Sequence, residues 1–239
     1  MENIEELIQN YTPGANTAET LAKSRIVLFV GIVAAGKDTV IGKLEKLDGY
    51  RRVVTCTTRP LRINDGVLET DGFDYHFLSM EEMKRRIDDR EMIEINKFGS
   101  NFYGAHIDEF ITAQRENQIA LTDIDVNGIA SFRKIAPESV TALFIVPPDY
   151  DTWRSRLRQR YTSEDVFDEE WQERRDITID ELEHALAAPY YHFIINDDLE
   201  RAVRVIDEIA HKPDEFNLHD EDARQVATDL LADIRAGIR

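Results

Sequence analysis

The sequence predicts an α/β fold with a largely parallel central sheet. Short apolar runs that suit buried strands alternate with longer segments in which apolar residues recur at helical spacing. Such alternation is typical of crossover connections, which join parallel strands. The expected strands cover 26–30, 52–56, 92–95, 118–124, 141–146 and 192–196, and the expected helices cover 37–47, 79–90, 107–116, 127–136, 149–160, 168–187 and 198–211.

The segment 198–211 has the clearest helical pattern. Its apolar residues recur every three or four positions, directly after the acidic pair Asp197-Asp198. An aspartate at this place can accept hydrogen bonds from the first free N–H groups of a helix. Two further helices are predicted near the ends of the chain, over 3–10 and 217–238.

Two stretches interrupt the alternation of strands and helices. Residues 57–77 are rich in glycine, aspartate, asparagine and proline, with interspersed aromatic residues, and residues 156–175 are dense in arginine. We therefore expect each to be an excursion from the main domain.

The composition excludes several classes of protein. The chain has 239 residues and a net charge of −18, which disfavours binding to nucleic acid or to an anionic membrane. The single cysteine, Cys56, excludes a disulfide framework and suits a reducing cytoplasm. No apolar stretch is long enough to span a bilayer, and the acidic N-terminus does not resemble a signal peptide. We expect a cytoplasmic protein that binds phosphorylated ligands through local clusters of arginine.

A phosphate-binding loop is predicted after the first strand, where residues 30–39 read V-G-I-V-A-A-G-K-D-T. Gly31 and Gly36 allow tight turns that direct successive N–H groups into one concavity, and Lys37 adds a positive charge at the start of a helix. Asp38 occupies the place where this motif has serine or threonine, and Thr39 follows it. An ordinary strand–turn–helix connection is the alternative, but it would leave Lys37 opposing the helix dipole.

Two further clusters suggest an anion site with hydrogen-bonding groups: an arginine pair, and a set of two tyrosines with Glu94. Arg59 and Arg62 lie three apart on an extended, proline-containing segment, where they can converge on one phosphate or form a solvated charge pair. Tyr75 and Tyr103 offer phenolic donors or core packing. Glu94 lies inside an apolar run, so it needs hydrogen bonds unless that strand face is exposed.

The order of these motifs resembles the guanylate kinases, which phosphorylate GMP with ATP. The phosphate loop is followed by T-T-R-x-x-R, D-Y-H-F, M-I-E, Y-G, D-I-D and N-D-D-L across residues 26–200. The resemblance implies a P-loop three-layer fold with a subdomain that binds the nucleoside monophosphate (NMP) and a mobile lid. The implied division is a core of about 24–55, 107–155 and 176–212, an NMP-binding region of about 56–106, a lid of about 156–175, an N-terminal extension 1–23 and a C-terminal helical tail 213–239.

The resemblance also implies a role for each matching residue. ATP would contact Gly31, Ala34, Ala35, Gly36, Lys37, Asp38, Thr39 and Asn196. GMP would contact Thr55, Arg59, Arg62, Tyr75, Glu94, Tyr103, Gly104, Asp123 and Asp125. The catalytic set would be Lys37, Arg59, Arg156, Arg160 and Arg175.

Magnesium is the implied metal, bound with ATP, and its contacts would be Asp38 and Asp123, directly or through water. Asp123 and Asp125 are two apart, so on a strand they would share one face. The partners implied are the small-molecule nucleotides ATP and GMP, with the protein acting as a monomer or homodimer.

The chain departs from the family pattern at three places. They are Asp38, Ala105 in place of a serine or threonine that contacts guanine, and loops that look extended both over 62–75 and in the lid. We expect Asp38 to alter the metal affinity, and Ala105 to soften selectivity for guanine. Two alternatives are a ribose 1,5-bisphosphate kinase and a non-catalytic guanylate-kinase-like binding domain. Glu94 with its tyrosines argues against the first, and the intact loop argues against the second.

Overall fold

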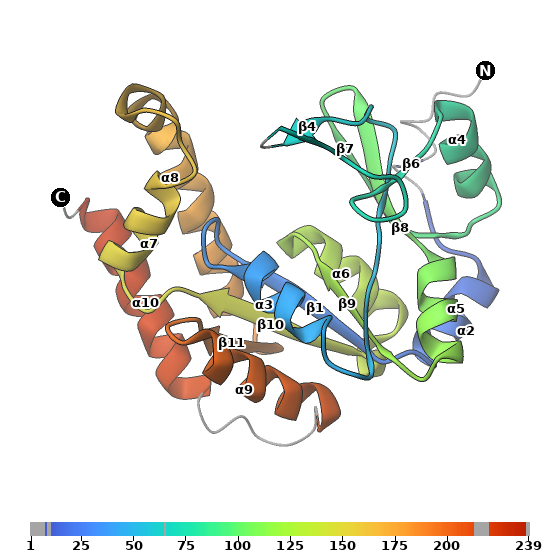
Figure 1. Ribbon diagram of the computed structural model, residues 1–239. Coiled ribbons are helices and arrows are strands. Elements are labelled where there is room, and N and C mark those ends of the chain that lie inside the picture. Colours follow the sequence, from blue (N-terminus) through green and yellow to red (C-terminus); the bar gives the residue numbers. More distant parts are fainter. Residues whose placement is uncertain (1–7, 9–10, 65, 213–219, 238–239) are drawn as a thin grey trace. The chain divides into compact units, whose positions relative to one another are not determined.

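The computed structural model describes residues 8, 11–64, 66–212 and 220–237 (Figure 1). The chain divides into two compact units, which are described separately. The first unit consists of residues 1–26, 49–122 and 130–140, and the second consists of residues 27–48, 123–129 and 141–239. The chain crosses between the units several times, so neither one is a simple half of the sequence.

The second unit is built on three adjacent strands in the order β11-β10-β1. Strands β10 and β11 pair in parallel, with Ala142 opposite Tyr191 and Val146 opposite Ile195. Every residue of β1 and β10 is buried, as expected for strands covered on both faces. The strands are β1 (Ile26–Gly31), β10 (Val140–Val146) and β11 (Tyr191–Ile195), and the helices are α3 (Lys37–Leu44), α7 (Tyr150–Arg158), α8 (Glu164–Ala187), α9 (Leu199–His211) and α10 (Asp220–Ala236).

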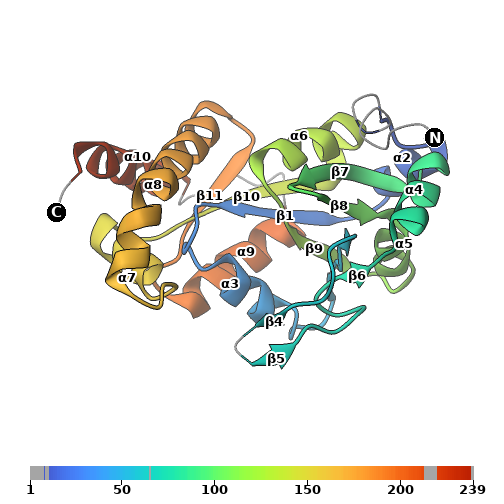
Figure 2. The same cartoon turned by 90° about the horizontal axis from the view of Figure 1, so that it is seen from above.

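Helices α9 and α10 show how this unit is covered. Asp198 accepts a hydrogen bond from the Arg201 N–H at 2.7 Å and so caps α9, which lies beside α3 (Figure 2). The buried positions of α9 recur at helical spacing, and the prediction for 198–211 is confirmed. Helix α10 packs against α8 and β11, which agrees with the predicted helix over 217–238.

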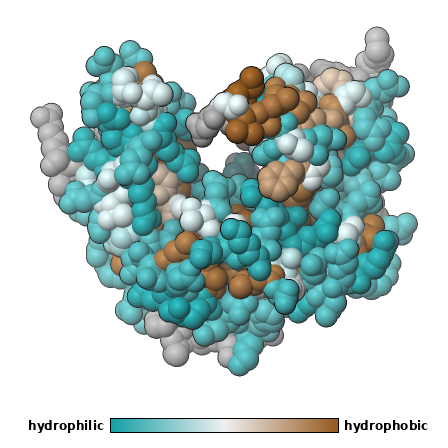
Figure 3. Space-filling view, viewed as in Figure 1, coloured by the Kyte–Doolittle hydropathy of each residue, from teal (hydrophilic) through white to brown (hydrophobic). Residues whose placement is uncertain are grey.

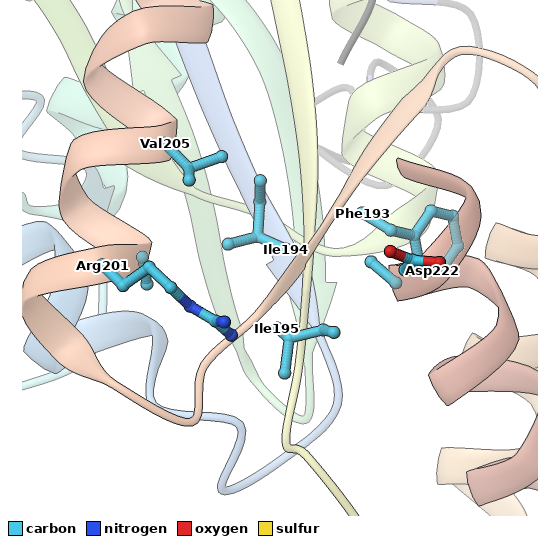
Figure 4. A pocket seen from close by; sticks show the side chains of 8 residues that line it. Phe193, Ile194, Ile195, Arg201, Val205 and Asp222 are labelled. Atoms are coloured by element: carbon cyan, nitrogen blue, oxygen red, sulfur yellow. The ribbon is translucent and has the colours of Figure 1, made fainter. Parts of the chain in front are cut away.

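A small cavity of about 110 Å³ lies where β11, α9 and α10 meet (Figure 4). Phe193, Ile194 and Ile195 of β11 give it a largely apolar lining, with Arg201 and Asp222 on the flanking helices. Arg201 is already paired with Asp197 at 2.5 Å. We attribute the cavity to helix packing.

The first unit contains a parallel pair and a four-stranded sheet. Strand β2 pairs in parallel with β9, and the four-stranded sheet has the order β6-β3-β8-β7. The strands of the first unit are β2 (Tyr50–Arg52), β3 (Cys56–Thr57), β4 (Ile63–Asn64), β5 (Val67–Leu68), β6 (His76–Phe77), β7 (Met92–Phe98), β8 (Asn101–His106) and β9 (Ile119–Asp123). Its helices are α2 (Ala15–Ala22), α4 (Met80–Asp88), α5 (Ile107–Arg115), α6 (Val126–Ile135), which begins in the second unit, and the short 3₁₀ helix η1 (Pro137–Ser139).

A local core supports the four-stranded sheet. It contains buried Cys56 from β3, Met83 and Ile87 from α4, and Met92, Ile95 and Phe102 from β7 and β8. Since Ile95 faces this core, its neighbours Glu94 and Asn96 lie on the opposite face of β7. The expectation that Cys56 is a buried small residue is confirmed.

The stretch 57–77 forms short strands rather than a plain loop. Strands β4 and β5 make an antiparallel hairpin, with Ile63 opposite Leu68. The hairpin leaves Ile63, Val67 and Leu68 largely exposed, and apolar side chains gather there on the surface (Figure 3). This hairpin lies within the stretch 62–75, for which the sequence predicts an extended loop.

Several predicted boundaries are wrong. The single strand expected over 52–56 is two strands, because β2 pairs with β9 whereas β3 pairs with β6 and β8. The arginine-rich stretch 156–175 is mostly helical: α7 continues to Arg158, and Ser163 caps an α8 that begins at Glu164. Helix α2 and strand β8 were not predicted.

The helix predicted over 3–10 lies outside the described residues except for Ile8. Among the helices that the structure describes, none combines the length and the apolarity needed to cross a membrane.

Candidate functional site

Two glycines shape the loop between β1 and α3. Gly31 has a φ of +149°, and a Cβ there would lie 2.3 Å from the Ile145 carbonyl oxygen of the adjacent strand. Gly36 has a φ of +93°, and a Cβ there would lie 2.3 Å from Nδ2 of Asn196. No other residue fits either position without displacing a neighbour. The predicted glycine-bounded loop is therefore confirmed as a structure.

The carbonyl groups of this loop are held by donors from three parts of the second unit. The Trp153 indole N–H donates to the Val33 carbonyl at 3.0 Å, and the Asn196 amide donates to the Ala35 carbonyl at 2.8 Å. The Lys37 ammonium donates to the Gly31 carbonyl, and to that of Ile32 at 3.3 Å. Sequence reasoning missed Trp153 as a partner, because 120 residues separate it from Val33.

The start of α3 is suited to an anion. Gly36 is its N-cap and provides no side-chain cap, so the first N–H groups of the helix have no intrahelical acceptor. These donors carry the positive end of the helix dipole. Asp38 and Thr39 lie exposed in this first turn, beside Lys37.

Burial lowers the pKa of Lys37, because the charged form is poorly solvated there. The carboxylates of Glu181, Asp123 and Asp38 act in the opposite direction, and Arg160 adds to the lowering. Burial also raises the pKa of Glu181, on α8. Glu181 was not predicted from the sequence, since its helix is uniformly rich in acidic residues.

A pocket of about 350 Å³ opens beside the loop, entirely within the second unit. Arg156 lies on its wall and donates from Nη2 to the Asn196 carbonyl at 3.0 Å. Its Nη1 is buried and has no hydrogen-bond partner among the described residues. A buried guanidinium N–H without an acceptor is well placed for an anionic ligand. The lining residues are Ala34, Gly36, Thr39, Arg156, Arg160, Asn196, Asp197 and Leu199.

Arg175 does not line this pocket. It donates from Nε to the Ile234 carbonyl at 3.0 Å and from Nη2 to the Arg235 carbonyl at 3.1 Å. These are carbonyls of the last turn of α10, so Arg175 caps that helix. Arg174 instead donates to the Tyr161 hydroxyl at 3.2 Å, within the segment predicted as the lid.

Asp123 and Asp125 do not share a strand face, contrary to the prediction. Strand β9 ends at Asp123, and Oδ1 of Asp125 accepts a hydrogen bond from the Gly128 N–H at 2.7 Å. Asp125 therefore caps the start of α6. The hydrogen bond by which Asp125 caps α6 is formed here in place of a continuation of β9.

In the first unit, Arg59 is buried and fully paired with Glu69. Its Nη1 and Nη2 atoms lie 2.7 and 2.8 Å from the two carboxylate oxygens, and the two side chains are 5% and 6% exposed. Glu69 also accepts a hydrogen bond from the Arg62 N–H at 2.7 Å. These contacts raise the pKa of Arg59, chiefly through Glu69 and further through Tyr103. The Arg62 side chain is exposed.

The outer face of the β7–β8 pair gathers the other predicted residues. Glu94 is opposite Ala105, and Asn96 is opposite Tyr103. The Asn96 amide donates to Oε2 of Glu94 at 2.5 Å. A Cβ on Gly104 would lie 2.4 Å from the Glu94 carbonyl oxygen, which explains the glycine.

Tyr75 extends the surface formed by this face. Its ring centroid lies 6.0 Å from that of Tyr103 and 5.3 Å from the Arg59 guanidinium carbon. Thr55 lies half-buried between β2 and β3, rather than on a strand. The first unit thus presents a carboxylate, an amide, two phenols and a paired arginine.

A family model described as guanylate kinase matches residues 23–212. The chain belongs to the guanylate kinase family. The guanylate kinase of Chlorobaculum tepidum is 32% identical over 189 residues, covering 79% of this chain and 92% of that protein. The guanylate kinase of Chlorobium luteolum is 34% identical, covering 76% of this chain and 88% of that one.

A solved structure also resembles this member of the guanylate kinase family. The crystal structure of guanylate kinase from Anaplasma phagocytophilum matches with a TM-score of 0.57 and 25% identity, covering 83% of this chain and 92% of that one. The family and the α/β fold predicted from the sequence are thereby confirmed, as a P-loop fold with a parallel central sheet. Helix α10 lies beyond the residues that the family model matches.

Proposed function

We propose that this protein transfers the γ-phosphoryl group of ATP to GMP or dGMP, forming ADP and GDP or dGDP. The main support is that this member of the guanylate kinase family has both the lysine-bearing loop and a carboxylate on the β7–β8 face. The loop supplies hydrogen-bond donors for an anion, and Glu94 supplies the hydrogen-bond acceptor that distinguishes guanine from adenine. The proposed NMP-binding region is about 56–106, and the proposed lid is about 156–175.

ATP would bind at the loop and its pocket. The N–H groups at the start of α3 and the Lys37 ammonium would hold the phosphates, and the buried Nη1 of Arg156 would find its missing acceptor there. Asn196 holds the loop by its side chain, so its proposed contact with adenine would come through the pocket that it lines. The proposed contacts are Gly31, Ala34, Ala35, Gly36, Lys37, Asp38, Thr39 and Asn196.

GMP would bind on the β7–β8 face. Glu94 would accept hydrogen bonds from N1–H and the exocyclic amino group of guanine, a pair of donors that adenine lacks. Arg59, held in place by Glu69, would direct the edge of its guanidinium at the GMP phosphate, together with Tyr75 and Tyr103. The proposed contacts in the first unit are Thr55, Arg59, Arg62, Tyr75, Glu94, Tyr103 and Gly104. Asp123 and Asp125, which the resemblance also assigns to GMP, belong to the second unit.

The reaction needs positioning more than covalent chemistry. An oxygen of the GMP phosphate attacks the γ-phosphorus of ATP as the bond to the bridging oxygen of ADP breaks. The attacking phosphate is already ionised, so no general base is required. Lys37, Arg156 and Arg160 stabilise the charge that spreads over the transferred group. Arg175 would join them only after leaving the end of α10.

The residues beside Lys37 suit magnesium. Asp38, Thr39 and Asp123 carry hard oxygen donors, and Mg²⁺ in such enzymes takes one or two carboxylates with phosphates and waters. When bound, Mg²⁺ offsets the negative charge of the ATP phosphates.

Neither alternative is favoured. A ribose 1,5-bisphosphate kinase would not need Glu94 supported by Asn96. A non-catalytic binding domain would not need a loop whose carbonyls are held by three separate donors. We also propose a cytoplasmic location, which suits the unpaired Cys56, and a monomeric or homodimeric state.

An acceptor screen tests the function. Purified protein with MgATP is given GMP, dGMP, AMP, CMP, UMP or ribose 1,5-bisphosphate, and ADP release is measured. We expect GMP and dGMP to stimulate release far more than the others. Equal rates with all mononucleotides, or a rate only with the sugar bisphosphate, would contradict the proposal.

A further inference from the structure

Trp153 connects the ATP loop to the helices that follow β10. It lies on α7 and is fully buried, and its indole N–H is 3.0 Å from the Val33 carbonyl. That carbonyl belongs to the peptide that precedes Ala34, whose φ is +63°. A left-handed conformation is unfavourable for alanine, so neighbouring contacts must hold it. The hydrogen bond from Trp153 to the Val33 carbonyl is such a contact, on the peptide that precedes Ala34.

The ring of Trp153 continues into the segment proposed as the lid. Its centroid lies 5.7 Å from that of Trp171 on α8, and Trp171 lies 5.4 Å from Phe167. Phe167 in turn lies 5.4 Å from Tyr161, in the connection between α7 and α8. A continuous row of aromatic rings therefore runs from the loop to the start of α8.

We propose that Trp153 is a positioning residue for the ATP loop. Its N–H holds the Val33 carbonyl away from the concave side, so that the N–H groups of the loop and of α3 face the phosphates. Its ring ties that loop conformation to the position of α8. The inference rests on the proposed function only in identifying the anion as ATP.

The two tryptophans of the chain provide a matched pair of variants. Trp153→Phe keeps an aromatic ring but removes the donor to Val33, whereas Trp171→Phe alters the same row of rings without touching the loop. Binding of the magnesium complex of β,γ-imido-ATP, and separately of GMP, is measured by calorimetry. We expect Trp153→Phe to weaken binding of the ATP analogue about 5- to 10-fold, the usual effect of losing one hydrogen bond.

Binding of the ATP analogue should change less than twofold in Trp171→Phe, and GMP binding should be unaltered in both variants. Unchanged binding of the analogue in Trp153→Phe, equal losses in the two variants, or an equal loss for GMP would overturn the proposal. Absence of GMP-dependent turnover in the unaltered protein would instead contradict the proposed function.

A spectroscopic measurement covers the case in which Trp153→Phe does not fold. In Trp171→Phe, Trp153 is the sole tryptophan, so its fluorescence reports on the loop. We expect the ATP analogue to shift the emission maximum, and GMP to leave it unchanged. No shift with the analogue, or the same shift with GMP, would overturn the proposal.

Discussion

The two units hold their key cations in different ways. In the first unit, Arg59 is paired through both terminal nitrogens with the Glu69 carboxylate, and its pKa is raised. In the second unit, Lys37 donates to main-chain carbonyls, and burial lowers its pKa. Arg59 is therefore satisfied within its own unit. Among the described residues, Lys37 is stabilised by neutral main-chain dipoles and by the longer-range field of nearby carboxylates.

The difference indicates different tasks. A paired arginine is a fixed element of the binding surface, and removing its partner would leave a buried charge uncompensated. A desolvated lysine gains most when an anion arrives, because the new charge replaces the missing solvation. We infer that the first unit is organised before its ligand binds, and that the electrostatics of the loop are completed by ATP.

The largest effect should come from removing the loop cation. We expect Lys37→Ala to lower kcat about 10²- to 10³-fold, as for loss of a donor to the transferring group, while the affinity for GMP is retained. Steady-state kinetics and GMP titration would show this. Lys43→Ala, on the same helix but exposed and paired with Glu200, is the control and should keep normal turnover. Normal kcat in Lys37→Ala would contradict the role given to the loop.

A loss of stability should follow from breaking the buried ion pair in the first unit. Glu69→Ala leaves Arg59 buried without its carboxylate, and we expect the free energy of unfolding to fall by about 3 kcal/mol. Urea denaturation followed by circular dichroism would measure it. Removing an exposed carboxylate of α4, in Glu81→Ala, should have little effect by comparison. Equal stability of the two variants would show that the pair is not needed.

The smallest effect concerns the unusual aspartate of the loop. If Asp38 contributes to metal binding, Asp38→Ala should raise the Mg²⁺ concentration for half-maximal rate a few-fold, as expected for one of several oxygen contacts. A magnesium titration at saturating ATP would measure the shift. Asp48→Ala, an exposed aspartate outside the loop, should leave the titration unchanged. An unaltered curve for Asp38→Ala would exclude a role in the metal site.

The sequence was sufficient for the features that depend on local pattern. Periodic apolar residues predicted α9, and the pair Gly36-Lys37 predicted the loop between β1 and α3. Helix faces and tight turns depend on residues that are close together in the sequence. Strand β8 was missed because Gly104 and several polar residues obscure its alternation. Even so, its register fixes where Tyr103 lies relative to Asn96.

Other contacts depend on distant segments. Glu69 is separated from Arg62 by the β4–β5 hairpin, and the Trp153 donor lies 120 residues beyond its acceptor. Arg175 caps α10, a helix beyond the matched region, so family similarity could not reveal its partner. Tertiary pairing of this kind has no signal in local spacing.

We propose that GMP binds on the β7–β8 face of the first unit and that ATP binds at the loop of the second unit. Calorimetric titration of two variants, Lys37→Ala and Glu94→Gln, can separate the two sites. Each variant is titrated with the magnesium complex of β,γ-imido-ATP and with GMP. We predict that Lys37→Ala loses the ATP analogue and retains GMP, whereas Glu94→Gln loses GMP and retains the analogue. If either variant loses both nucleotides, or loses neither, the two nucleotides do not bind at separate sites in the two units.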